Sequence, residues 1–81
     1  MTPTRLTQET LMPEMAYVDS SNIEQVGYDA DNMELHVVFK DSSLYVYRDV
    51  PVQIYEELLG APSKGSFLNR AIKGVYEYDK R

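Results

Sequence analysis

The sequence has no cysteine and a single histidine among its 81 residues. Without cysteine, a disulfide framework and a thiolate metal site are excluded. A lone histidine makes a poor metal site, because structural and catalytic metals are held by several convergent ligands. We expect His36 at the surface, since it points away from Leu35 and Val37 on a predicted strand. The composition therefore predicts neither a bound metal nor a cofactor.

The sequence also lacks any run approaching the ~20 apolar residues that cross a bilayer. Its start shows no basic stretch followed by an apolar one, so we expect no signal peptide and a soluble, cytoplasmic protein. Residues 1–14 show no sustained period and predict a flexible arm. Residues 15–81 predict one small domain, whose thin core leaves little room for a deep active site.

Charge is unevenly spread along the chain. Residues 1–59 hold three basic and eleven acidic side chains, a net charge of −8, whereas residues 60–81 hold five basic and two acidic ones, a net charge of +3. The whole chain carries −5. This asymmetry indicates a surface for a charged partner. The alternative is that the five cations simply form a solvated face.

Three segments alternate apolar and polar residues at the period of a strand, namely residues 23–29, 33–39 and 43–48. Short polar connections join them, which predicts a three-stranded antiparallel meander. Residues 75–81 alternate again and predict a short extra strand. Gly27, inside the first strand, indicates a bulge or a close approach of another backbone.

Two helices are predicted after the meander. Pro51 fits the first helical position of the first one, and Gly60 followed by Pro62 fits its exit. The second runs over residues 66–73, where apolar residues recur at helical spacing, and Gly74 is its expected left-handed stop. The elements together predict an α+β fold, in which two short helices cover one face of a small antiparallel sheet.

The stretch APSKGSFLNRAIKG, residues 61–74, has the character of an anion-binding loop. A helix that begins near Ser66 leaves its first backbone N–H groups unpaired, and either Ser63 or Ser66 can cap it. Gly65 permits a close approach to the backbone, and Lys64 and the helix dipole both favour an anion. The alternative is an ordinary turn between helices. The candidate residues are Ser63, Lys64, Gly65, Ser66, Asn69, Arg70 and Lys73.

A pair of tyrosines, Tyr45 and Tyr47, shares one face of the third predicted strand. If Leu44 and Val46 meet the helices, the two phenol rings stand together on the open face of the sheet. Rings placed in that way stack on the bases of single-stranded RNA. The alternative is that the rings are half-buried packing residues with their hydroxyl groups in water.

No arrangement of residues typical of catalysis is found in the sequence. Ser20 and Ser21 have no base placed beside them, and the stretch DSSN is typical of a turn. Glu56 and Glu57 fall on the solvent side of the first predicted helix. We therefore predict that the protein is not an enzyme.

Four stretches, in their order and spacing, resemble the KTSC domain family. They are VDSSNIEQVGYD, LHVVF, YVY and VPVQIYEELLGAPSKGSFLNRAIKGVYEY. The YxY typical of the family is matched by Tyr45 and Tyr47. Its S-x-G-x-[YF]-x-N segment is matched by Ser63, Gly65, Phe67 and Asn69. The resemblance implies a domain that occurs at the C-terminus of some lysyl-tRNA synthetases and as free-standing small proteins, with RNA binding suggested and no catalytic residues.

Two functions stay open on the sequence. The first is a non-enzymatic binding module for RNA or a phosphate-bearing nucleotide, which joins the loop, the basic C-terminal segment and the tyrosine pair. The second is a protein-interaction module, such as an adaptor, an inhibitor or a homodimer formed through a sheet edge, with no nucleic-acid role. We place ligand binding ahead of the second function.

Overall fold

The computed structural model describes residues 13–81, and the predicted arm over residues 1–14 lies outside this part except for its last two residues. Five strands form one antiparallel sheet whose spatial order follows the chain, β1-β2-β3-β4-β5. The strands are β1 (Met15–Tyr17), β2 (Ile23–Asp29), β3 (Glu34–Phe39), β4 (Leu44–Tyr47) and β5 (Tyr78–Lys80). Two helices, α2 (Val52–Gly60) and α3 (Lys64–Ala71), lie between β4 and β5 in the chain.

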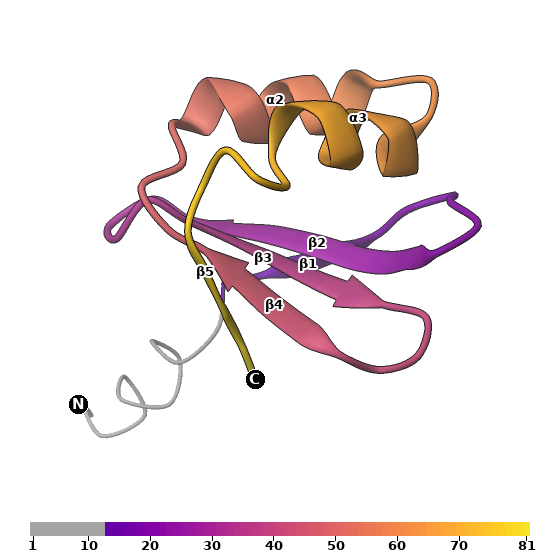
Figure 1. Ribbon diagram of the computed structural model, residues 1–81, viewed down its shortest axis with the longest axis horizontal. Coiled ribbons are helices and arrows are strands. Elements are labelled where there is room, and N and C mark those ends of the chain that lie inside the picture. The colour runs from indigo at the N-terminus through magenta and orange to yellow at the C-terminus, as the bar shows by residue number, and fades with distance from the viewer. Residues whose placement is uncertain (1–12) are drawn as a thin grey trace, which may run out of the picture.

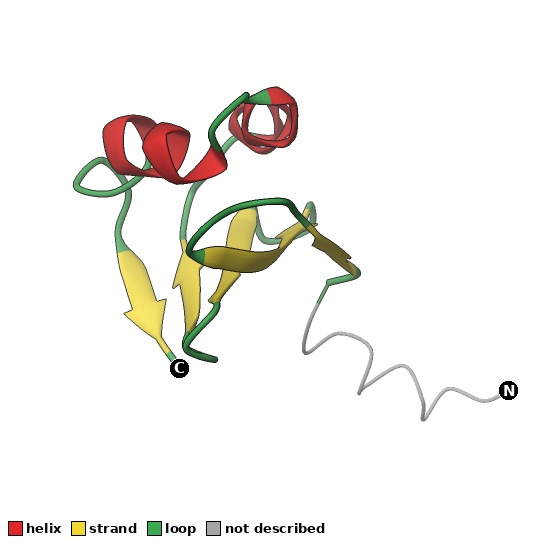
Figure 2. Ribbon diagram, turned by 90° about the vertical axis from the view of Figure 1, so that its right-hand side faces the viewer, coloured by secondary structure: helices red, strands yellow, loops and turns green. Residues whose placement is uncertain are grey.

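Both helices lie over the same face of the sheet (Figure 1), and a view at right angles shows the two layers separated in the same way (Figure 2). This arrangement confirms the α+β class. The predicted meander corresponds to β2, β3 and β4, and the short extra strand to β5. The prediction was incomplete in one strand, β1, which has only three residues, too few for a periodic signal.

The core lies between the helices and the facing side of the sheet. Leu35 and Val37 of β3 are fully buried there, and their antiparallel partners on β4 are Tyr47 and Tyr45. The buried core residues are Ile23, Val26, Leu35, Val37, Tyr47, Val50, Leu58, Ala61, Phe67, Leu68 and Ile72. The strand period therefore places both tyrosines of β4 on the helix side.

Strand β2 reaches the core with two residues that simple alternation would place on opposite faces. The register with β3 shifts between Ile23 and Gln25, so Ile23 and Val26 are both fully buried. At Gly27 the predicted close approach is confirmed, because an added Cβ would contact the Met15 sulfur and lie 2.8 Å from the Glu14 carbonyl oxygen. Glycine is what allows β1 to lie this close to β2.

Helix α3 begins two residues earlier than predicted and also ends two residues earlier. Ser63 caps it, since its Oγ accepts a hydrogen bond from the Ser66 amide at 3.3 Å. Lys73 therefore lies in the turn after the helix, next to Gly74, whose φ of 79° confirms the expected left-handed stop. Pro51 is extended and precedes α2 instead of occupying its first turn.

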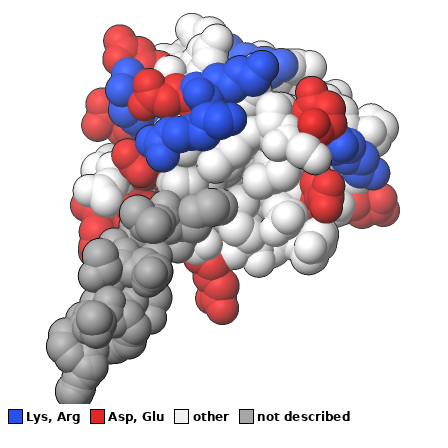
Figure 3. Space-filling model, turned by 90° about the horizontal axis from the view of Figure 1, so that it is seen from below, with Lys and Arg blue, Asp and Glu red and all other residues white. Residues whose placement is uncertain are grey.

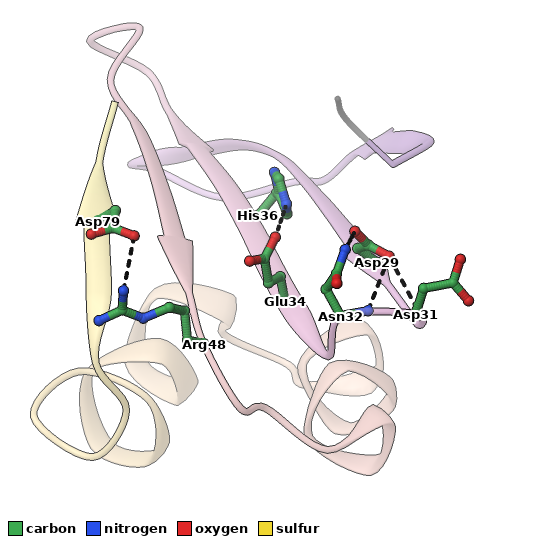
Figure 4. Close-up of polar contacts among 7 residues, drawn as sticks. All are labelled: Asp29, Asp31, Asn32, Glu34, His36, Arg48 and Asp79. Atoms are coloured by element: carbon green, nitrogen blue, oxygen red, sulfur yellow. Dashed lines mark hydrogen bonds and ion pairs between the residues drawn. The ribbon is translucent and has the colours of Figure 1, made fainter. Parts of the chain in front are cut away.

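His36 contradicts the prediction that it lies at the surface, since it is only 2% exposed. It does point away from the helices, but its neighbours in register on that face are Gly27 and the fully buried Val46. Glu34 Oε1 lies 3.5 Å from its Nε2 (Figure 4). Burial lowers the pKa of His36, and the nearby Glu34 carboxylate opposes this shift.

The face of the sheet that the helices leave uncovered has a largely uncharged centre, bordered by side chains of both signs (Figure 3). Near β5, the guanidinium of Arg48 pairs with Asp79 at 3.2 Å (Figure 4) and with Glu77 at 3.1 Å. These two ion pairs join the end of β4 to the segment that leads into β5. Exposed pairs of this kind each contribute little to stability, typically below ~1 kcal/mol.

Candidate functional site

The predicted anion loop forms one wall of a pocket of about 430 Å³, which we call the loop pocket. The opposite wall is the connection between β1 and β2, residues 19–22, and Asn69 also contributes to the lining. Four of the predicted residues, Ser63 to Ser66, therefore do line one concave surface. The pocket contains a carboxylate as well, because Asp19 lies in its lining.

The amide groups at the start of α3 are partly engaged within the protein. Ser63 Oγ takes up the Ser66 amide, as described above. Gly65 does permit a close approach, but the group that approaches is the side chain of Asn22, whose Oδ1 would lie 2.9 Å from an added Cβ. Asn22 Oδ1 in turn accepts a hydrogen bond from Ser20 Oγ at 3.2 Å. The side chain beside Gly65 is thus an amide without net charge, whose oxygen is the atom closest to the loop backbone.

The ammonium group of Lys64 does not extend freely from the loop. It donates a hydrogen bond of 2.9 Å to the carbonyl oxygen of Ala61, the residue after α2. Lys64 therefore closes the turn between the helices and contributes positive charge to the pocket from a fixed position.

Of the two alternatives for Tyr45 and Tyr47, the open face is contradicted and packing is confirmed. Tyr47 is 1% exposed and belongs to the core, while Tyr45 packs against the core and is half-buried. The reason is the register, which sets them opposite Val37 and Leu35 on the helix side. Val46, between them, is the residue that points away from the helices. A base therefore has no access to the ring of Tyr47 comparable to that on an open sheet.

The two tyrosines nevertheless belong to an aromatic cluster that reaches the surface. Tyr45 stacks on Tyr78 with ring centroids 5.2 Å apart, and Phe39 meets Tyr45 edge-on at the same distance. Tyr47 lies 5.6 Å from Tyr78. Tyr78, from β5, is 52% exposed. The cluster thus extends from a buried ring, Tyr47, to an exposed one.

Lysine side chains lie over the rings of this cluster. Lys73 Nζ is 5.8 Å from the centroid of Phe39, and Lys80 Nζ is 5.8 Å from the centroid of Tyr45. Both distances lie within the ~6 Å range of cation–π attraction. Arg70, also predicted as a ligand residue, lies instead over Phe67, with its guanidinium carbon 5.3 Å from that centroid. The aromatic cluster and the positive charge are therefore combined in one place.

Two further pockets connect the loop pocket to this cluster. A middle pocket of about 340 Å³ shares Ser21 and Asn22 with the loop pocket. A tyrosine pocket of about 290 Å³ shares Tyr45 and Lys73 with the middle pocket. We call the three adjoining pockets the α3 groove. The loop and the tyrosines therefore lie on one continuous surface.

Sequence reasoning missed several residues of the α3 groove. They are Asn22, Phe39, Lys40, Tyr78 and Lys80, which line its pockets or lie over its rings. One signal in the sequence pointed toward Tyr78 and Lys80, namely the alternation of residues 75–81. It predicted a strand there, but not that this strand pairs with β4. The ladder that sets Tyr78 opposite Tyr47 is a property of the folded sheet.

Outside the α3 groove, one further pocket of about 410 Å³ lies beside Arg48 and residues 74–78 in the described part of the chain, and it shares Gly74 and Tyr78 with the tyrosine pocket. Among residues 13–81, no group of three histidine, aspartate or glutamate side chains is placed to hold a metal ion. No helix in that part has the length and apolar character needed to span a membrane. The α3 groove is the surface on which a functional argument can be built.

The fold is that of a small α+β domain, and its surface carries an open groove with polar and aromatic lining. The chain belongs to the KTSC domain family, whose model matches residues 19–76. The KTSC domain protein from Yersinia pestis, known from a crystal structure, shares 35% sequence identity and a TM-score of 0.81 with it. That match covers 84% of this chain and 96% of the Yersinia chain.

Relatives occur both as small proteins and as parts of large ones. A protein of Tsukamurella paurometabola is 39% identical over 59 residues, which cover 73% of this chain and 88% of that protein. A lysine–tRNA ligase of Trichormus variabilis is 36% identical over 62 residues, which cover 76% of this chain. The chain spans only 11% of the length of that ligase.

Proposed function

We propose that this domain binds RNA in the α3 groove, without catalysing a reaction. The observation that carries the proposal is the continuity of the groove. It brings the N-terminal end of α3, a line of lysines and an aromatic cluster onto one surface, although they come from distant segments of the chain. Proteins that bind single strands combine a positive groove with aromatic rings in this way.

The local charge of the groove supports an anionic ligand despite the acidic chain. Its lysines are Lys40, Lys64, Lys73 and Lys80. Its carboxylates are Asp19 and Asp41. Glu77 and Asp79 lie next to Tyr78 in the chain, but both pair with Arg48. Because charges beyond about 8–10 Å are screened at physiological salt, the acidic residues farther away oppose an anion only weakly. The open, elongated form of the groove favours a strand over a single enclosed nucleotide.

The relatives support the same choice. The name lysine–tRNA ligase states that those enzymes act on tRNA, and one of them carries a segment 36% identical to this chain. A domain joined to such an enzyme meets RNA at high effective concentration, where even weak binding is useful. The proposal concerns this domain alone, since it spans a small part of the ligase.

The experiment is a titration of the isotope-labelled protein followed by amide NMR spectra at low salt. A short single-stranded RNA is added in one series and a mononucleotide in another. We expect the RNA to shift the amide signals of Ser66, Lys73 and Gly74 at lower concentration than the mononucleotide does. Amide signals that stay in place with RNA at low salt would refute the proposal.

A protein-interaction module is the second candidate, and the structure gives it less support. Each edge of the sheet, β1 and β5, is three residues long. Short edge strands are one of the ways by which proteins avoid pairing with other chains. Light scattering across a range of protein concentrations tests this candidate, and a stable dimer would favour it over RNA binding.

A further inference from the structure

The tyrosine pocket differs in chemistry from the rest of the groove. Its lining consists of three tyrosines, Tyr45, Tyr47 and Tyr78, together with Lys73 and Gly74. The loop pocket, in contrast, is lined mainly by serines, asparagines, Asp19 and Lys64 and has no aromatic side chain in its lining. One end of the groove is therefore suited to polar groups, and the other is suited to a flat, apolar ring with a negative charge nearby.

We propose that the tyrosine pocket receives one unpaired nucleobase, which stacks on Tyr78, so that the domain selects single-stranded over double-stranded RNA. This inference rests on the proposed function and assigns a role to one end of the same groove. A base in a duplex is stacked and paired, so it enters a protein pocket only after the energy of unstacking and unpairing has been supplied.

The ring that would meet the base is held in place before binding. Tyr78 is 52% exposed, while Tyr45 stacks against it with an interplanar angle of 29°. Tyr45 is itself fixed by Phe39 and by the buried Tyr47. A ring held in this way loses little conformational entropy when a ligand stacks on it, so more of the stacking energy appears as affinity.

The size of the pocket and its open side fit a single ring system. Its volume of about 290 Å³ lies just below the ~300–1,000 Å³ that is usual for ligand pockets. No atom lies within 4 Å of where a Cβ on Gly74 would be. The pocket is therefore open beside Gly74, and the sugar attached to the base can leave through that side.

Two lysines flank the position of the base. Lys73 lines both the tyrosine pocket and the middle pocket, and Lys80 Nζ lies 5.8 Å from the Tyr45 ring. A nucleotide whose base is in the pocket would therefore present its flanking phosphates to a lysine on either side. The contacts are to the face of the base and to phosphate, so we expect tolerance of base identity.

The test compares three ligands of equal length and three variants. The ligands are a single-stranded RNA, the same RNA in a duplex, and an abasic strand that keeps the phosphates. The variants are Tyr78→Ala, Tyr78→Phe and, as a matched control, Tyr17→Ala. Tyr17 is also an exposed tyrosine on an edge strand, but it points away from the helices and lies outside the groove.

We expect Tyr78→Ala to weaken single-strand binding about 5- to 150-fold, the range for the loss of one stacked base. Tyr78→Phe keeps the ring and should bind as the unaltered protein does, and so should Tyr17→Ala. The duplex and the abasic strand should both bind more weakly than the single strand. In the unaltered protein, the ring protons of Tyr78 should shift upfield when the RNA is added.

Two outcomes overturn the inference in ways that can be told apart. In the first outcome, RNA binds, but Tyr78→Ala binds the single strand as tightly as the unaltered protein does, and the unaltered protein binds the abasic strand and the duplex as tightly as the single strand. Phosphate contacts alone would then account for the affinity, and the stacking role would be refuted. If no RNA binds to the unaltered protein at low salt, the proposed function fails and the inference fails with it. Thermal unfolding of both Tyr78 variants ensures that they are compared in the folded state.

Discussion

Tyr47 carries a hydroxyl group in a position that is 1% exposed. Burial raises its pKa to about 12, with smaller contributions from Tyr45 and Tyr78. The folded protein therefore favours the neutral phenol form of Tyr47. At this scale the structure decides between the two alternatives for Tyr47, because its ring packs in the core and supports the rings of Tyr45 and Tyr78.

We expect stability to decrease in alkali partly because of Tyr47. Its pKa in the folded protein lies above the ordinary value of 10.0, so the unfolded chain loses the proton first. The contribution is complete below about pH 10 and is lost as the pH rises toward about 12. Tyr47→Phe should weaken this dependence without abolishing it, because burial also raises the pKa of Tyr28 and Tyr55. Urea unfolding at about pH 9 and about pH 11 measures the loss of unfolding free energy in both proteins. An equal loss in Tyr47→Phe and in the unaltered protein would contradict the role given to Tyr47.

His36 leads to the opposite expectation at mildly acidic pH. Burial lowers its pKa below the ordinary value of 6.5, so the unfolded chain binds the proton more readily. The free energy of unfolding should be at its full value above about pH 6.5 and should fall as the pH drops below it. The chain has no other histidine, so His36→Gln should remove the slope between about pH 7 and about pH 5.5, whatever its absolute stability. Urea unfolding at several pH values measures this slope, and an equal slope in His36→Gln and in the unaltered protein would refute the role of His36.

The orientation of single residues was the part that local pattern predicted least well. In β4, Leu44 and Val46 alternate with Tyr45 and Tyr47, and both sets suit a buried face. A strand with two apolar faces carries no signal for which face meets the core. His36 was misplaced for a related reason, because β3 is the central strand and its neighbours bury the middle of the uncovered face, although Glu34 and Val38 on that face stay partly exposed.

At the scale of elements, the contact between β1 and β2 depends on a missing side chain. A Cβ on Gly27 would lie 2.8 Å from the Glu14 carbonyl oxygen, and backbone cannot move aside as a flexible side chain can. We expect Gly27→Ala to destabilise the protein by about 1–3 kcal/mol, the usual cost of overpacking. Gly60→Ala is the matched control, since no atom lies within 4 Å of its added Cβ and alanine favours a helix. Urea unfolding of both variants gives the comparison, and equal stabilities would contradict the close contact.

Element types were predictable from the sequence, whereas their ends were less so. Helix α3 was expected from Ser66, but Ser63 caps it. Both serines satisfy the chemistry of a cap, and they are three residues apart, so the sequence alone does not choose between them. The choice shifts the helix by two residues and moves Lys73 from a helix face into the lining of the groove.

At the scale of the whole molecule, the α3 groove could not be predicted because its parts are far apart in the sequence. It joins residues 19–22, the end of β3, the start of α3 and β5. The class of fold, the order of elements and the family were all accessible from the sequence, since each depends on local pattern. Which loops meet depends on packing, which has no local signature.

The groove predicts a particular dependence of RNA affinity on salt. For single strands, the slope of log affinity against log salt is about −0.7 for each phosphate contact. We expect Lys73→Gln to reduce that slope by about 0.7 and to weaken binding, because it removes one such contact. Gln53→Glu, on the exposed surface of α2, changes the net charge by the same amount outside the groove and is the matched control. If both variants lose affinity equally, net charge and not the groove governs binding.

The agreement between strand order and chain order also bears on how the chain folds. Three of the four ladders join strands that follow one another directly through a short turn, and these can close early at little entropic cost. The ladder between β4 and β5 must wait for α2 and α3, and residues that it brings together, such as Arg48 and Asp79, lie 31 positions apart. We therefore expect a largely local and fast folding route in which the meander forms first and β5 docks last, so that the tyrosine pocket is completed only in the final step.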